Sequence, residues 1–233
     1  MNKNIALLIS CEHAVNTVPE QYINHFTPFN ELLNTHRGID IGALEIAQYL
    51  KETVPSYLVQ STMTRLLVDC NRSINHPTFF SEITRALPPE AKSDLIDLYY
   101  TPYRNQVIDF IKRSNSEGLK VWHISIHSFT PVMNEIIRKT DIGLLYDPRR
   151  LEEKAVAKQW KTEMAVLSPQ LRIRMNYPYK GISDGFTKCL RKQFSANEYL
   201  GIQIELNQAL TANDQALNSL KNILSLSLLK ILC

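Results

Sequence analysis

A glutamate, a histidine and an asparagine follow the first apolar run of the chain, where they could bind a metal ion or transfer protons. Residues 5–9 form this run, and Glu12, His13 and Asn16 come shortly after it. Side chains of these types are poor core residues, whereas imidazole and carboxylate groups ligate metals and act as general acids and bases. The segment is therefore a candidate site, although a histidine here would also suit a structural or surface position.

A second histidine, His127, lies at the end of another apolar run, residues 122–128. Side chains alternate along an extended strand, so His123, Ser125 and His127 share one face. A ligand could reach His127 at the strand end, whereas His123 lies roughly 13 Å further back in the sheet. We therefore expect His127 to be functional and His123 to be a hydrogen-bonded core residue.

Two arginines flank the apolar stretch 66–68. Arg65 precedes it, and the sequence Asp69-x-Asn71-Arg72 follows it. A guanidinium offers a fork of donors that matches a carboxylate or a developing oxyanion. The segment could therefore bind an anionic group, but a surface strand with salt bridges would show the same pattern.

A late carboxylate, Glu205, ends the apolar run 201–206. Alternation places Gln203 and Glu205 on the face opposite Ile202 and Ile204. Partial desolvation at the end of such a strand would raise the pKa of Glu205 toward the range useful for a general base. A solvated glutamate on an edge strand is the alternative.

Short apolar runs alternate with longer helical patterns along the whole chain. The predicted strands span residues 5–9, 56–61, 121–126, 142–146 and 202–205, and the main predicted helices span residues 40–50, 89–117, 151–167 and 214–232. This alternation predicts an α/β fold, a three-layer α/β/α sandwich with a mostly parallel, mixed central sheet. Ligands bind beyond the carboxyl ends of strands in such sheets, where the candidate residues cluster.

Three of the predicted helices carry specific expectations. Asp40 can cap the amino end of the first of them. Pro102 is expected to kink or break the helix 89–117, which ends before Gly118. The last helix carries a stripe of leucines that could form an oligomer face, but packing against the sheet is the preferred interpretation.

Composition excludes several classes of protein. The chain has 233 residues, 44% of them hydrophobic, which excludes a disordered protein. Twenty-six Lys and Arg residues against 23 Asp and Glu residues leave a net charge of +3 without a block of like charge, so neither a nucleic-acid nor a membrane partner is expected. No repeat or linker divides residues 1–233, which predicts a single domain.

The expected location is cytoplasmic. The amino-terminal residues lack the pattern of a signal peptide, and no apolar run reaches the length of about 18 residues that a membrane span needs. The four cysteines share no C-x-x-C spacing, so we expect reduced thiols.

Taken together, these segments resemble the N-formylglutamate amidohydrolase family. The resemblance extends over most of the chain, and its parts occur in the family's order. It rests on Ser-Cys-Glu-His (10–13), His-Arg-Gly-Ile-Asp-Ile-Gly-Ala (36–43), Ser-Thr-Met-Thr-Arg-Leu-Leu-Val-Asp-Cys-Asn-Arg (61–72), His-Ser-Phe-Thr-Pro (127–131), Gly-Leu-Leu-Tyr-Asp (143–147), Tyr-Lys-Gly-Ile-Ser-Asp-Gly (179–185) and Ile-Glu-Leu-Asn (204–207).

This resemblance implies a phosphorylase/hydrolase-like fold of the zinc-dependent exopeptidase and aspartoacylase type, with one zinc ion at the strand ends. It also implies a role for each motif residue. These roles are metal ligands for His13 and His127, oxyanion stabilisation for Arg65, substrate binding for Asn71 and Arg72, and general base for Glu205.

The third metal ligand departs from the related pattern. Related aspartoacylases take it from a glutamate three residues after the first histidine, and Asn16 stands there in this chain. An amide oxygen is a poor zinc ligand beside a carboxylate. The missing carboxylate must then come from Glu12 or from Asp40, and we favour Glu12 because it adjoins His13 in the same loop.

The function implied by the resemblance is zinc-assisted hydrolysis of the amide bond in a small N-acyl amino acid, such as N-formylglutamate. Lys180 could meet a second carboxylate of such a substrate. One alternative is a zinc amidase or carboxypeptidase-like enzyme that acts on a peptide or a cell-wall fragment. Another is a non-catalytic carboxylate-binding protein, which Asn16 would suit. Whether the chain is a monomer or a homo-oligomer stays undecided.

Overall fold

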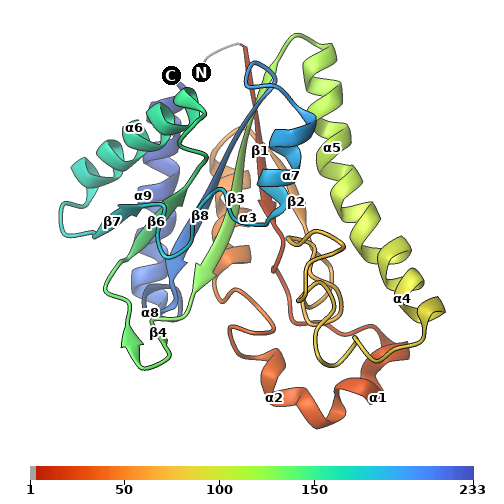
Figure 1. Cartoon of the computed structure of the whole chain (residues 1–233). Coiled ribbons are helices and arrows are strands. Elements are labelled where there is room, and N and C mark those ends of the chain that lie inside the picture. Colours follow the sequence, from red (N-terminus) through yellow and green to blue (C-terminus); the bar gives the residue numbers. More distant parts are fainter. Residues whose placement is uncertain (1–3) are drawn as a thin grey trace.

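Six strands form the central sheet of the computed structural model, which describes residues 4–233 (Figure 1). Their order across the sheet is β2-β1-β3-β8-β6-β7, and every pair is parallel except β6 with β8. The predicted mixed, mostly parallel sheet is confirmed. The strands are β1 (Ile5–Cys11), β2 (Tyr57–Gln60), β3 (Lys120–Phe129), β6 (Ile142–Leu145), β7 (Ile173–Met175) and β8 (Tyr199–Asn207).

Helices cover both faces of this sheet and complete the three layers (Figure 1). One face packs against α3 (Ala43–Thr53), α6 (Leu151–Leu167) and α9 (Asp214–Leu232). The other packs against α4 (Pro89–Leu95), α5 (Thr101–Ser116) and α7 (Phe186–Gln193). Within residues 4–233, no helix has both the length and the apolar character that crossing a membrane requires.

Shorter elements gather mainly at the carboxyl ends of the parallel strands, at the lower side of Figure 1. They include the two-stranded hairpin of β4 (Val132–Met133) and β5 (Ile136–Ile137). Neither this hairpin nor the edge strand β7 was predicted from the sequence. The others are α1 (Ile23–Phe26), α2 (Asn30–Leu33), α8 (Gln208–Thr211) and the 3-10 turns Glu20–Tyr22 and Thr27–Phe29.

The two faces of the sheet differ in chemistry because side chains alternate along each strand. Ile124 and Ile126 of β3 point into an apolar layer that also buries the leucine stripe of α9, so this stripe packs within the fold as expected. On the opposite face, the register places His127 of β3 directly beside Glu205 of β8. The polar residues of the two strands thus lie on one buried face, at its carboxyl end.

One expectation about a helix end was wrong. Asp40 does not cap α3, because the helix begins after Gly42, whose φ of 77° suits glycine and whose added Cβ would lie 2.6 Å from Cβ of Thr211. The Asp40 carboxylate instead faces His13 and His127. At Pro102 the helical run continues, but a π-helical segment (Ile96–Tyr100) divides it into α4 and α5 just before the proline, so the expected disruption is present as a change of hydrogen bonding.

The segment between β2 and α4, residues 61–88, has no regular secondary structure, yet it carries both arginines of the candidate site. Hydroxyl groups take the place of a backbone ladder there. Thr84 Oγ1 donates to the Leu67 carbonyl at 2.8 Å, and Ser81 Oγ donates to the Leu66 carbonyl. The backbone N–H of Asp69 also donates to the Phe79 carbonyl at 2.9 Å. These bonds hold the segment against the end of the sheet.

Candidate active site

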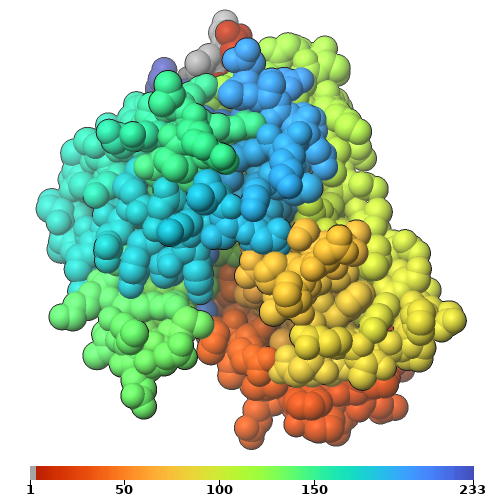
Figure 2. Space-filling model, viewed as in Figure 1, coloured from red at the N-terminus to blue at the C-terminus, as the bar shows by residue number. Residues whose placement is uncertain are grey.

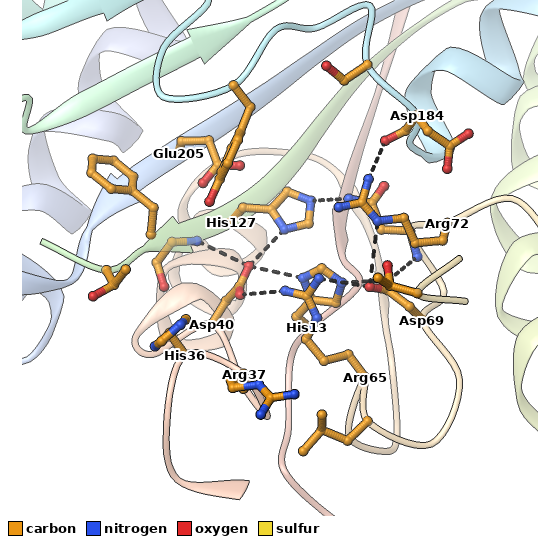
Figure 3. Close-up of a pocket in the computed structure, with 18 of the residues that line it drawn as sticks. His13, His36, Arg37, Asp40, Arg65, Asp69, Arg72, His127, Asp184 and Glu205 are labelled. Carbon is orange, nitrogen blue, oxygen red and sulfur yellow. Dashed lines mark hydrogen bonds and ion pairs between the residues drawn. The ribbon is translucent and has the colours of Figure 1, made fainter. Parts of the chain in front are cut away.

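Two histidine rings converge on one aspartate at the carboxyl ends of β1 and β3 (Figure 3). Asp40 Oδ2 lies 3.2 Å from Nδ1 of His13 and 2.8 Å from Nδ1 of His127. All three side chains are almost fully buried, and the ligand atoms they offer lie within 4.8 Å of one another. This geometry suits a single metal ion.

Three separate segments bring these side chains together. His13 follows β1, His127 lies near the end of β3, and Asp40 precedes α3. The backbone N–H of Asp40 donates to the His13 carbonyl at 3.1 Å, and the backbone N–H of Ser128 donates to Asp40 Oδ2 at 3.2 Å. Asp40 is therefore tied to both histidine segments by backbone hydrogen bonds, which fixes the direction of its carboxylate.

The far nitrogen of each ring faces a second carboxylate. His13 Nε2 lies 2.9 Å from Asp69 Oδ1, and His127 Nε2 lies 3.2 Å from Glu12 Oε2. Each ring therefore lies between two carboxylates, with Asp40 at Nδ1 and a second carboxylate at Nε2. Nδ1 of both rings thus lies within 3.2 Å of the same carboxylate oxygen, Oδ2 of Asp40. Such a donor set fits a cation.

The carboxylates around the rings are held in their charged forms. Burial alone would raise the pKa of Glu12, but the hydrogen bond with His127 and the charge of that ring outweigh burial and hold the pKa below its ordinary value. The pKa values of Asp40 and Asp69 are likewise lowered, because neighbouring cationic groups outweigh burial. Several buried negative charges therefore surround the rings, which also favours a bound cation.

Glu205 differs from these carboxylates. It is 6% exposed, and its Oε2 is buried without a hydrogen-bond partner in the part of the chain that the structure describes. Burial raises the pKa of Glu205 to about 7, in the direction that the strand pattern predicted. A carboxylate with this pKa can accept and return a proton near neutral pH.

The two arginines occupy the side of the pocket near Asp69. Arg65 Nη2 donates to Asp69 Oδ2 at 2.8 Å, and its Nη1 lies 3.6 Å from Asp40 Oδ1. Arg72 Nη1 donates to the Asp184 carbonyl at 2.7 Å, while its Nε is buried without a hydrogen-bond partner among residues 4–233. This Nε faces Asp69, whose Oδ2 lies 4.0 Å away, so the two groups form an ion pair without a hydrogen bond.

Asn71 links this segment to α7. Its Oδ1 accepts a hydrogen bond from the backbone N–H of Phe186 at 2.8 Å, and its Nδ2 lies 3.5 Å from Nε2 of His127. Asn16, by contrast, donates to Asn34 at the surface and does not line the pocket.

These side chains line one pocket of about 620 Å³. Figure 2 shows a hollow where the gold segment, the cyan-blue loop and the green hairpin meet. Of the residues predicted from sequence, the pocket brings together His13, Asp40, Arg65, Asn71, Arg72, His127, Lys180 and Glu205. Lys180 is exposed there, and no hydrogen bond or ion pair of its side chain is found in residues 4–233.

Glu12 is the predicted residue that does not line the pocket. It is buried behind His127, where Ser10 and Ser125 donate to its two oxygens at 2.7 and 2.8 Å. Sequence reasoning assigned no role to Asp69, although it stands in the Asp69-x-Asn71-Arg72 motif. His123 is a core residue as predicted, since it is fully buried and hydrogen-bonded to Ser10 and to Tyr199.

Comparisons with known proteins identify the family and the fold. The model of the N-formylglutamate amidohydrolase family matches residues 5–212. A crystal structure of a gene product from Agrobacterium tumefaciens is 28% identical, with 99% of this chain and 91% of that chain covered and a TM-score of 0.82. A crystal structure of an N-formylglutamate amidohydrolase from Ralstonia eutropha is 17% identical, with 99% of this chain and 94% of that chain covered. Its TM-score of 0.64 shows that the two proteins share the fold. No curated protein matches the sequence.

Proposed function

The chain belongs to the N-formylglutamate amidohydrolase family, and on that premise we propose that it hydrolyses the amide bond of a small N-acyl amino acid, with N-formylglutamate as the first candidate. The observation that supports this most is a pair of neighbouring features in one pocket. The ligand atoms of His13, Asp40 and His127 lie within 4.8 Å of one another there, and Glu205 lies beside them with a carboxylate oxygen that has no hydrogen-bond partner in residues 4–233.

We infer that one zinc ion is the cofactor and that His13, Asp40 and His127 hold it. Glu12, the other candidate for the third ligand, faces the far nitrogen of His127, so we assign it the task of orienting that ring. When bound, such an ion polarises an amide carbonyl and lowers the pKa of water to about 7.

Glu205 is the proposed general base. Its pKa of about 7 and its unpartnered Oε2 support a carboxylate that takes a proton from water as the carbonyl carbon is attacked. The same oxygen then delivers that proton to the leaving nitrogen. Its place beside His127 in the sheet register supports attack at the metal side of the pocket.

The arginines are the proposed binding groups. Arg65 contacts both Asp40 and Asp69, so its guanidinium lies beside the ligand set and can stabilise the negative charge that develops on the carbonyl oxygen. Arg72, with the amide of Asn71, is the proposed partner of the substrate α-carboxylate, which is supported by the place of both residues in the pocket lining and by an Arg72 Nε without a hydrogen-bond partner in residues 4–233. Lys180 at the exposed rim would add attraction for an anionic substrate.

A reducing compartment such as the cytoplasm is the proposed setting. All four cysteines are free, and Cys11 and Cys70 are fully buried. Free thiols persist where disulfides are kept reduced.

Amine release from N-formyl, N-acetyl and N-succinyl amino acids tests the proposal. The purified chain is assayed after loading with zinc and after treatment with a chelator. We expect zinc-dependent hydrolysis of N-formylglutamate, and we expect Glu205→Gln to keep its zinc while kcat falls by about 1000-fold. Binding of these compounds without hydrolysis would instead support the carboxylate-binding alternative. Near-normal turnover by Glu205→Gln would remove that residue from the role of base.

A further inference from the structure

A line of buried polar side chains leads from His127 into the interior of the sheet, and the proposed mechanism does not use it. Its members are Glu12, Ser10, His123 and Tyr199, all of them almost fully buried. Ser10 lies on β1, His123 on β3 and Tyr199 on β8, three strands that are neighbours in the sheet. We call these four side chains the Tyr199 chain.

Short contacts join the members of the Tyr199 chain without a gap. Tyr199 Oη lies 2.7 Å from Nδ1 of His123, and Nε2 of the same ring lies 2.7 Å from Ser10 Oγ. Ser10 Oγ in turn donates to Glu12 Oε1 at 2.7 Å. The other oxygen of Glu12 lies 3.2 Å from Nε2 of His127. The chain therefore ends at a ring that is proposed to hold the metal.

The hydrogen bonds of the Tyr199 chain all run in one direction. A carboxylate accepts only, so the single proton of Ser10 Oγ goes to Glu12, and Ser10 must accept from Nε2 of His123. Burial lowers the pKa of His123 to about 4, so the ring is neutral near pH 7 and its Nδ1 accepts from the Tyr199 hydroxyl. Every donor thus points toward Glu12, and hydrogen bonds in such a series strengthen one another.

A glycine makes room for the far end of the chain. Gly201 pairs with His123 in the register between β3 and β8, and Tyr199 lies two positions earlier on the same face of β8. A Cβ on Gly201 would lie 2.5 Å from the Tyr199 hydroxyl oxygen. That hydroxyl therefore occupies the space of a missing side chain beside His123, and the hydrogen bond between the two residues depends on this glycine.

Packing alone does not account for the polar groups of the chain. Tyr199 belongs to an apolar layer that also contains Leu8 and Val121. A buried hydroxyl or imidazole costs free energy unless it is hydrogen-bonded, whereas a matched pair of apolar side chains can take the place of two such groups at little cost. The common direction of the donors indicates instead that the chain acts on the Glu12 carboxylate.

We propose that the Tyr199 chain positions a metal ligand, an inference that rests on the proposed function. Its outer three members fix the Glu12 carboxylate, which in turn orients the His127 ring for zinc. None of these three lies among the residues that line the pocket, so each is a positioning residue that acts through Glu12. Partners of a ligating histidine raise metal affinity by holding its ring, and the chain does so at one remove.

A double-mutant cycle on zinc affinity, measured by competition with a chelator, tests the proposal. His123→Leu removes the ring that links Tyr199 to Ser10, and we expect zinc affinity to fall by about 10-fold. In the background of Glu12→Met, which keeps the side-chain length without an acceptor, the same change should cost less than about 2-fold. Equal losses in the two backgrounds would overturn the proposal, because a purely structural role of His123 does not depend on Glu12.

A milder variant keeps the test valid if His123→Leu does not fold. Tyr199→Phe retains the ring and removes only the hydroxyl, and it should lower zinc affinity by less than His123→Leu does. Tyr22→Phe is the matched control, because it removes a buried hydroxyl of the same apolar layer that donates to the Ala91 carbonyl at 3.5 Å. Zinc affinity should be unchanged in the control. Unchanged affinity in a folded Tyr199→Phe would overturn the proposal.

NMR of the imidazole nitrogens in the zinc-free protein gives a readout that is independent of metal. His123 should carry its proton on Nε2 near neutral pH, with Nδ1 unprotonated. The opposite tautomer, or a doubly protonated ring, would overturn the direction of the chain and with it the proposal.

Activity separates the two proposals. If wild type binds zinc but hydrolyses no N-acyl amino acid, the proposed function fails, while the cycle still tests the Tyr199 chain because it measures zinc affinity alone. If wild type hydrolyses N-formylglutamate and the losses in the cycle are additive, only the Tyr199 chain fails. Wild type that binds no zinc would overturn both.

Discussion

Two clusters of buried charge lie in this molecule, and their hydrogen bonding differs. The first, the Glu153 cluster, joins Glu153 of α6 to Arg191 of α7. The Arg191 Nε donates to both oxygens of Glu153 at 2.9 and 3.1 Å, and the backbone N–H groups of Asp147 and Gly201 also donate to that carboxylate. The remaining Arg191 nitrogens donate to the carbonyls of Gly181 and Gly201. Each charged group of this cluster is satisfied within the chain.

The pocket cluster, which contains His13, Asp40, His127 and Glu205, is open by comparison. Nδ1 of His13 and of His127 converge on one oxygen of Asp40 there, and Glu205 Oε2 has no hydrogen-bond partner among the residues described. Buried polar groups are normally hydrogen-bonded, so an open cluster indicates that another species completes it. Of these two clusters, the one completed within the chain is a structural ion pair, and the incomplete one is the candidate site.

Removal of a ligand should have the largest effect in the open cluster. Asp40→Asn should weaken zinc binding by about 1000-fold or more, because a charged ligand is replaced by a poorly ligating amide. Competition with a chromophoric chelator measures this affinity. Asp109→Asn, on the exposed side of α5, serves as the matched control. Unchanged zinc affinity in Asp40→Asn would contradict the ligand assignment.

Removal of one partner from the closed cluster should affect stability instead of metal binding. Glu153→Gln leaves Arg191 buried without its countercharge, which should cost about 3 to 5 kcal/mol in the free energy of unfolding. Urea denaturation measures it, and the loss should be the same with and without zinc. Arg149→Met breaks an ion pair whose arginine is exposed, so it should barely move the urea midpoint. A loss that appeared only with zinc present would connect the two clusters.

The Glu205 carboxylate should reduce the stability of the metal-free protein at neutral pH. Its pKa rises from 4.5 to about 7 on folding because of burial. Below about pH 4.5 the group is protonated in both states and costs nothing, whereas above about pH 7 the folded state carries the full penalty, up to about 3 kcal/mol. Glu205→Gln should therefore stabilise the chelator-treated protein at pH 8 and not at pH 4.

Thermal unfolding at the two pH values measures this difference. Glu52→Gln, an exposed change on α3, is the control and should show no pH-dependent gain. Equal or lower stability of Glu205→Gln at pH 8 would mean that the buried carboxylate carries no such penalty.

Regular, periodic segments were predictable from sequence and irregular ones were not. The bounds of α6 and α9 agree with the sequence pattern, since apolar residues repeat at helical spacing in both. The conformation of residues 61–88 was not predicted, because it depends on hydroxyl-to-carbonyl bonds such as that from Thr84 to Leu67, which leave no periodic signal. A strand pattern is local, whereas these contacts join residues that are far apart in the chain.

The same limit applies to the candidate site. The positions of His13, His127 and Glu205 at strand ends could be predicted, because alternation and strand length set them. The partners of the rings could not. Asp69 contacts a ring 56 positions away, and nothing in the sequence shows which nitrogen a carboxylate faces. Proximity in the chain favoured Glu12 over Asp40 as the third ligand, but it says nothing of the direction of the side chain.

The smallest effect should distinguish these two carboxylates. Glu12 accepts hydrogen bonds from Ser10 and Ser125 and faces the far nitrogen of His127. Glu12→Gln should therefore weaken zinc binding by about 10- to 100-fold, as expected for a group that orients a ligand without touching the metal. The chelator competition used for Asp40→Asn measures both variants on one scale. If Glu12→Gln lost more affinity than Asp40→Asn, Glu12 would be the ligand and the Asp40 carboxylate its support, because a directly bound carboxylate must contribute more than one acting through an imidazole.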